Sequence, residues 1–340
     1  MLISAVDKIS SIFDRAFVIG YWAPVLVSGG FAGAIAAALV GPGEVRDWWE
    51  DLSGAEQGLL GAAVLVAITV AATVLQALAV PITRLFQGHW PAVAGLGRLR
   101  SWAESMKRRR VAELQALSQS QDGEAALAIL QLQFPNSNVR ATRLGNVFAA
   151  AEDYSFQMYR VDAAHWWPRL TPLLPETLRS QIDQALTLVL GLLNMSGGIG
   201  TVAVIGSGFI WWQSDRWLLF SGVLGGGLLL AWLLYNAAVE QAIAYGRLYC
   251  LAFDQHRKKV LEAMEIPFPE DLVAERHLWQ AMGEWVYLYR PPWESANAAS
   301  LPSLARPFKY RGVEQSTPKP LPTRPDRLRV EGQIDIRRRP

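Results

Sequence analysis

Four stretches without a charged residue constrain this chain more than any other feature. They cover residues 17–40, 58–83, 184–214 and 217–239. A helix rises about 1.5 Å per residue, so roughly 20 apolar residues cross the hydrocarbon core of a bilayer, and each stretch is long enough. The sequence therefore predicts an all-α polytopic membrane protein with four transmembrane helices and a helical cytoplasmic layer.

Composition agrees with a membrane protein and disfavours several kinds of site. Only 18% of the residues are charged, against about 25% in a typical soluble chain. Because the chain has one cysteine, Cys250, and four scattered histidines, we expect no intramolecular disulfide, no metal site and no cofactor. The formal net charge of +2 gives no reason to expect binding to nucleic acid.

The charges that flank the spans predict the topology. Residues 41–57 are acidic, whereas Lys and Arg gather after the second and fourth spans. Lys and Arg near spans stay on the cytoplasmic side. We therefore expect a multi-pass protein of the cell (inner or plasma) membrane with both termini in the cytoplasm. Cleavage of the first span as a signal peptide is disfavoured because the span is long and its leader contains Asp7 and Asp14.

This topology divides the chain into five regions. We expect a compact transmembrane hairpin over 1–83, a cytoplasmic helical loop over 84–183, a second transmembrane hairpin over 184–239 and cytoplasmic helices over 240–290. Residues 291–340 hold nine prolines, with ten Lys and Arg against five Asp and Glu. Such a composition cannot build a core and predicts a disordered basic tail.

The third stretch is too long for an upright span and is rich in glycine and small polar residues. Glycine weakens a helix by about 1 kcal/mol relative to alanine, so a kink or a tight crossing is expected. Two interpretations stay open. The polar residues line a pore or hinge, or they bond to carbonyls of neighbouring helices. The candidates are Asn194, Ser196, Gly197, Gly198, Gly200 and Thr201.

Two glycine pairs have the spacing of a helix-packing motif. Gly29 and Gly33 lie four residues apart in the first span, as do Gly222 and Gly226 in the fourth. Small residues at this spacing let helix backbones approach closely in a membrane. The pairs predict packing either within one four-helix bundle or between subunits of a homo-oligomer.

Within the long loop, a basic amphipathic helix is expected. Its apolar stripe runs from Leu99 through Trp102, Met106 and Leu114 to Leu117. Such a helix lies on anionic lipid headgroups or packs on its own bundle. The candidate headgroup ligands are Lys107, Arg108, Arg109 and Arg110.

A cluster of polar residues follows over 143–170. Paired carboxylates near arginines hold a ligand or, more often, cap helices and form local ion pairs. We expect Asp162 to cap a helix, and Arg169 to pair with Glu152 or Asp153. The whole cluster is Arg143, Asn146, Glu152, Asp153, Tyr154, Arg160, Asp162 and Arg169.

The run RLGNVFAAAEDYSFQMYRVDAAHWWPRL over 143–170 resembles a segment of uncharacterised multi-pass bacterial membrane proteins, with the pattern LGN…AAEDY…RYG.D…WPRL. The chain has Val161 where that pattern has glycine. The resemblance implies a membrane protein with four spans and no particular activity. The layout of spans and long cytoplasmic segments is similar to that of bestrophin-type channels, without a shared motif.

These features favour a non-enzymatic function. The chain has no HExxH, GxSxG or Walker motif. We expect an oligomeric channel or pore whose third span lines or gates the path and is coupled to cytoplasmic helices. The alternative is a membrane-anchored scaffold, signalling or defence component that binds a cytosolic protein through its helices and tail.

Overall fold

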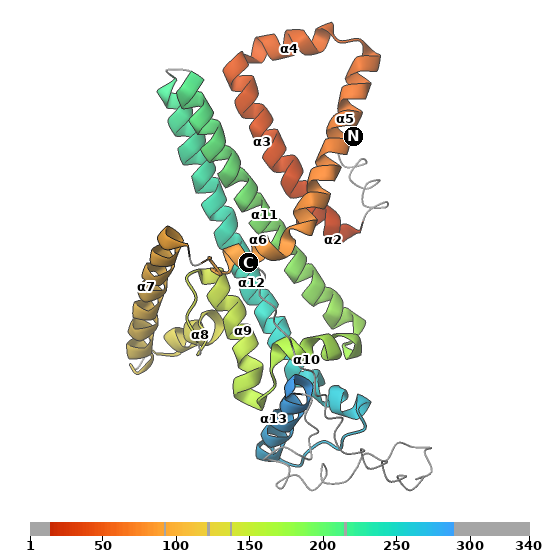
Figure 1. Ribbon diagram of the computed structural model, residues 1–340, viewed down its shortest axis with the longest axis vertical. Coiled ribbons are helices and arrows are strands. Elements are labelled where there is room, and N and C mark those ends of the chain that lie inside the picture. Colours follow the sequence, from red (N-terminus) through yellow and green to blue (C-terminus); the bar gives the residue numbers. More distant parts are fainter. Residues whose placement is uncertain (1–13, 92, 121–122, 137, 214–215, 289–340) are drawn as a thin grey trace, which may run out of the picture.

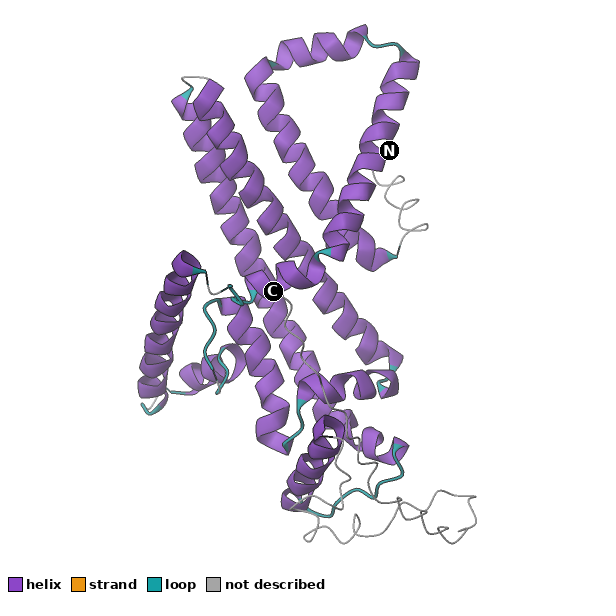
Figure 2. Cartoon of the chain, in the orientation of Figure 1, coloured by secondary structure: helices purple, strands orange, loops and turns teal. Residues whose placement is uncertain are grey.

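The computed structural model describes residues 14–91, 93–120, 123–136, 138–213 and 216–288. Every regular element in these ranges is a helix (Figure 2). Four helical segments are long and apolar enough to cross a membrane: Arg15–Val40, Gly54–Ala77, Glu176–Gln213 and Trp217–Ala263. The expectation of an all-helical chain with four spans is confirmed. The predicted basic tail over 291–340 lies outside the described residues.

Helices α11 (Glu176–Gln213) and α12 (Trp217–Ala263) pack side by side along the length of the molecule (Figure 1). Both continue well beyond the charge-free stretches at 184–214 and 217–239. The glycines of α11 do not break the helix. The tight crossing of the two helices depends on a glycine of α12. A Cβ added at Gly227 of α12 would lie only 2.4 Å from the Cβ of Ala203 on α11. The absence of a side chain at Gly227 therefore sets how closely the two helices approach.

The first span is one continuous helical path of three parts. Helix α2 (Arg15–Phe17) leads into a π-helical turn, η1 (Val18–Trp22), and then into α3 (Ala23–Val40). The path packs on α11 at Gly191, where an added Cβ would lie 2.7 Å from the carbonyl oxygen of Ile19. Close backbone approach at a glycine thus fixes the first span to α11.

The first hairpin is open, which corrects the expectation of a compact one. Helix α4 (Pro42–Asp51) separates the upper ends of α3 and α5 (Gly54–Ala77), and the two spans converge near η1 (Figure 1). The reason is that the acidic link is itself helical. Ten helical residues extend about 15 Å, so they hold the two spans apart instead of folding them together.

The second span also ends earlier than expected. Helix α5 stops at Ala77, and a separate helix α6 (Ala79–Phe86) follows a turn at Leu78. Pro81 explains the break, because proline lacks an N–H and its ring clashes with the carbonyl four residues before it, which is that of Ala77. The span is therefore residues 54–77 and not 58–83.

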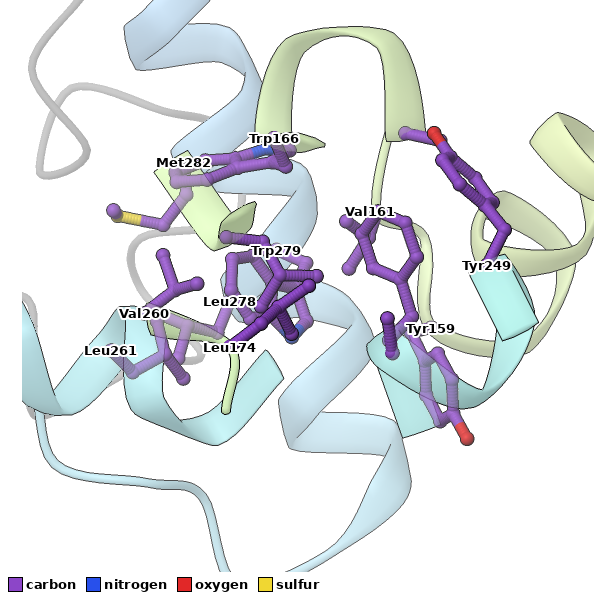
Figure 3. Packing of buried hydrophobic residues seen from close by; sticks show 14 of the residues in the cluster. Tyr159, Val161, Trp166, Leu174, Tyr249, Val260, Leu261, Leu278, Trp279 and Met282 are labelled. Atoms are coloured by element: carbon purple, nitrogen blue, oxygen red, sulfur yellow. The ribbon is translucent and has the colours of Figure 1, made fainter. Parts of the chain in front are cut away.

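Helices α9 (Arg143–Tyr159), α10 (Ala163–Leu170) and α13 (Leu272–Leu288) pack around the ends of α11 and α12 that lie far from α4 (Figure 1). We call this part the distal body. Trp166, Leu278 and Trp279 are almost fully buried in its core (Figure 3). Trp279 and Met282 of α13 both lie in this core and dock the helix on the distal body.

Helices α7 (Ala94–Ser118) and α8 (Glu124–Gln133) lie beside α9 at the edge of the molecule. One of the two predicted alternatives was that the apolar stripe of α7 packs on its own helix bundle. The structure does not show this packing. Leu114 is buried, but Leu99, Trp102, Met106 and Leu117 are exposed. On the basic face, Lys107 is half-buried and Arg108, Arg109 and Arg110 are exposed. Helix α7 thus presents an amphipathic surface to its surroundings.

The crossing of α11 and α12 yields a prediction with a matched control. Gly227→Ala is expected to lower the free energy of unfolding by about 1–3 kcal/mol, because the new methyl group overpacks against Ala203. Gly226→Ala is expected to leave it unchanged or raise it by up to about 1 kcal/mol, since nothing lies within 4 Å of a Cβ there. Denaturation of the monomer in detergent measures both. Equal effects of the two substitutions would contradict this packing.

Candidate functional site

Asn194 and Ser196, the two most polar candidate residues of the third span, are buried within the protein. Asn194 is 8% exposed and donates a hydrogen bond of 2.8 Å from Nδ2 to the carbonyl oxygen of Gly20. Ser196 is 6% exposed and donates one of 2.8 Å from Oγ to the carbonyl oxygen of Ala231. Each side chain ties α11 to another span. This geometry is the one expected of polar groups that bond to neighbouring carbonyls.

Of the remaining candidates in the third span, the three glycines pack against neighbouring side chains, whereas Thr201 is exposed. An added Cβ would meet Phe86 at Gly197, Ser28 at Gly198 and Ala231 at Gly200, at 3.3, 2.2 and 3.6 Å respectively. Thr201 is exposed and lines a cavity between α3 and α11. The six residues therefore do not form one continuous polar surface in a single chain.

The paired glycines have no intramolecular partner in the described residues. Nothing lies within 4 Å of a Cβ added at Gly29, Gly33, Gly222 or Gly226. Within one chain the close approaches occur at other glycines, among them Gly191, Gly198 and Gly227. The four paired positions face the surroundings of the monomer.

The polar cluster over 143–170 is spread along α9 and α10 and does not gather at one site. At the start of α9, Arg143 bonds Asn236 at 3.1 Å. Asn146 is fully buried, where it accepts from the backbone N–H of Arg140 and donates to the carbonyl oxygens of Arg140 and Thr142. Arg143 and Asn146 therefore stabilise the start of α9, which is a structural role.

The far end of the cluster lies beside α13. Asp162 caps α10 as predicted, by accepting a 3.0 Å hydrogen bond from the backbone N–H of Ala164. Burial opposes its ionisation, but the hydrogen bond from Tyr287 and the nearby His165 ring, whose Nδ1 lies 3.4 Å from the carboxylate, outweigh burial and lower the pKa of Asp162. Its carboxylate therefore also holds α13 against α10.

The expected ion pair of Arg169 with Glu152 or Asp153 is wrong. Arg169 instead donates to the carbonyl oxygen of His165 at 2.8 Å and lies over the ring of Trp166. The two carboxylates lie on the preceding helix α9, 17 and 16 residues before Arg169 in the chain, and Arg140 pairs with Glu152 at 3.3 Å. Local backbone carbonyls were nearer to Arg169 than any carboxylate.

Val161 lies just after the end of helix α9. The helix ends at Tyr159, and its C-cap residue, Arg160, adopts the left-handed conformation with φ 62°. The left-handed residue is thus Arg160, and the next position, Val161, is 1% exposed within the core of the distal body. A side chain at 161 fills space that glycine would leave empty.

The middle of the cluster joins a network that the sequence did not reveal. Tyr154 and Tyr159 on α9 both donate hydrogen bonds to the carboxylate of Asp254 on α12, at distances from 2.8 to 3.1 Å. Burial, followed by these hydrogen bonds, raises the pKa of both tyrosines, so they remain neutral donors. Among the described residues, Asp254 has no ion-pair partner.

A buried ion pair lies next to this network. Arg257 of α12 and Glu275 of α13 are 2.6 Å apart, and Glu275 is 3% exposed. Trp279 donates from Nε1 to the same carboxylate at 3.2 Å, and Arg257 stacks 3.8 Å from the ring centroid of Tyr159. Arg257 and Glu275 are 18 residues apart in the chain, and Arg257 and Tyr159 are 98 apart, so no local sequence pattern could have predicted these contacts.

A groove of about 690 Å³ opens directly beside Asp254, and we call it the distal groove. Its walls are α8, α9 and α12, and its lining is mostly apolar, with Asp153, Asp254 and Arg247 as the charged residues. Apolar walls with a few converging polar groups are typical of a binding site. The lining includes Leu127, Leu130, Tyr154, Met158, Gly246 and Cys250.

Comparison with protein-family models, with curated proteins and with solved structures finds no match to this chain.

The buried ion pair between Arg257 and Glu275 yields a prediction. Arg257→Gln is expected to lower the free energy of unfolding by about 3 kcal/mol, because it leaves the buried Glu275 carboxylate without its partner. The control is Lys258→Gln on the same helix, whose exposed pair with Glu262 at 3.8 Å contributes under about 1 kcal/mol. Urea titration followed by tryptophan fluorescence measures both. Similar losses would show that the buried pair is not a stabilising contact.

Proposed function

We propose that this is a membrane-anchored scaffold or signalling protein whose distal groove captures an amphipathic segment of a soluble partner. The observation that carries the proposal is the position of the groove. It lies outside the apolar part of α12, yet Gly246 and Asp254 of the same helix line it. With Lys and Arg near the spans kept in the cytoplasm, the groove faces the cytosol.

The chemistry of the groove defines its partner. An apolar helix face fills the walls made by Leu127, Leu130 and Met158. Two carboxylates, Asp153 and Asp254, face one guanidinium, that of Arg247. Charge complementarity therefore favours a segment with a basic side chain among its apolar residues.

A continuous helix offers a path from this groove to the membrane. Helix α12 runs without interruption from the groove into the fourth span, where it is packed against α11 at Gly227. A partner that shifts α12 against α9 would therefore also act on the span pair. Coupling of this kind requires two arrangements of the pair with different affinities for the partner.

Photo-crosslinking in cells tests the proposal. A benzophenone amino acid at Leu127, which is 44% exposed within the groove, is expected to give a discrete protein adduct that mass spectrometry identifies. The same probe at Leu117 on α7, which is 53% exposed and outside the groove lining, is the control for general exposure.

Two arginine substitutions on α9 make the test specific. Met158→Arg adds a positive charge to the groove lining and is expected to reduce the Leu127 adduct at least about fivefold, because it repels a basic segment. Phe156→Arg changes the same helix at a residue outside the groove lining and is expected to leave the adduct unchanged. Equal yields in both variants, or equal adducts at Leu127 and Leu117, would contradict the proposal.

An oligomeric channel is the second candidate, and the open glycine pairs favour it. Asn194 and Ser196 already form hydrogen bonds within one chain. Such a pore would therefore lie between subunits and not through one monomer. The faces that carry Gly29, Gly33, Gly222 and Gly226 are free for such contacts.

Conductance separates the two candidates. A channel predicts discrete current steps from the purified protein in planar bilayers, and loss of these steps with Gly29→Leu and Gly33→Leu, because leucine prevents close helix contact. Gly58→Leu, at another position without a neighbour within 4 Å, is the control. Silent bilayers from an intact protein would contradict the channel.

A further inference from the structure

A second cavity, far smaller and far more polar than the distal groove, lies between α7 and the segment before α9. We call it the basic cavity. Its volume is about 320 Å³, and three guanidinium groups line it, those of Arg100, Arg108 and Arg140. The first two lie eight residues apart on α7, so they project from one face of that helix. The remaining lining residues are Gly88, His89, Glu104, Asn138 and Val139.

The positive charge of this cavity is only partly compensated. Arg100 pairs with Glu104 at 2.7 Å, and Arg140 pairs with Glu152 at 3.3 Å. Arg108 has no hydrogen-bond or ion-pair partner among the described residues. Burial, and then the nearby charges of Arg140 and Arg100, lower the pKa of His89, so this side chain does not add a further positive charge to the cavity at neutral pH. An anion would relieve the repulsion among these groups.

An apolar cavity of about 340 Å³ adjoins the same segment of the chain. Leu85, Phe86, Trp90, Leu96 and Leu99 line it, and they alternate in the chain with residues of the basic cavity. The segment follows the second span directly, through α6. The exposed apolar stripe of α7 continues from this point. A charged cavity and an apolar cavity at the end of a span match the two parts of a lipid.

We propose that the basic cavity binds a phosphate group, and that a lipid headgroup is its source. Arginine forms paired hydrogen bonds to phosphate oxygens, and three arginines suit the two or more charges of a phosphate monoester. The adjoining apolar cavity receives the start of an acyl chain. The site is separate from the distal groove and does not depend on the function proposed for it. The proposed site involves Arg108 but not Arg109 and Arg110, which do not line the cavity.

Binding of a fluorescent short-chain phosphatidic acid to the full-length protein in a non-ionic detergent tests the site. Arg108→Gln is expected to weaken binding about tenfold, because it removes a charge-assisted hydrogen bond to the phosphate. Arg109→Gln makes the same charge change on the neighbouring residue and is expected to weaken binding less than twofold. Both variants should melt at the temperature of the parent protein, since Arg108 has no partner to lose.

Competition identifies the source of the phosphate. Displacement by unlabelled phosphatidic acid but not by millimolar inorganic phosphate supports a lipid headgroup. Displacement by inorganic phosphate supports the same site with a soluble phosphate as its ligand. Equal weakening by Arg108→Gln and Arg109→Gln, absence of binding, or equally tight binding of an uncharged diacylglycerol would overturn the proposal.

Discussion

The close pairing of α11 with α12 is the constraint on which the rest of this molecule depends. The two helices approach most closely at Gly227, where a Cβ would overlap Ala203, and Ser196 ties them by a hydrogen bond to the carbonyl oxygen of Ala231. The first span packs on α11 at Gly191. The distal body is built on the opposite ends of the same two helices. Two structural units thus share one continuous pair of helices.

Polar groups in the apolar part of this pair serve packing within the chain. The π-helical turn at Val18–Trp22 changes the normal helical bonding pattern, and the carbonyl oxygen of Gly20 within it accepts the hydrogen bond of Asn194. Because a polar side chain in a membrane requires a partner, this bond fixes the register of the first span on α11. It also removes Asn194 from any role in a water-filled path through one monomer.

Those parts of the fold that depend on residues near one another in the chain could be predicted from the sequence. The four spans and the cap at Asp162 are of this kind. The open hairpin and the early end of α5 at Ala77 were missed, because length and charge alone do not show where a link becomes helical or a span breaks.

The candidate site was harder to predict because its parts are distant in the chain. Asp254 contacts Tyr154, which is 100 residues away in the chain, and no spacing rule relates them.

The glycines show a second limit of prediction from the sequence. Gly226 is open and Gly227 is tightly packed, although the two are consecutive residues, because each step along a helix turns the side chain by about 100°. A four-residue spacing identifies a possible packing face but not the face in use.

Every coupling between the distal groove and the membrane requires α12 to be one unbroken helix from the fourth span to the groove. Nitroxide labels at Ser221 and Gln255, both exposed, in a Cys250→Ser background would measure this by pulsed electron paramagnetic resonance. We expect one narrow distance distribution near 51 Å, since the labels are 34 residues apart at about 1.5 Å per residue. A broad distribution, or a main distance well below about 40 Å, would show instead that the helix breaks between the membrane and the groove.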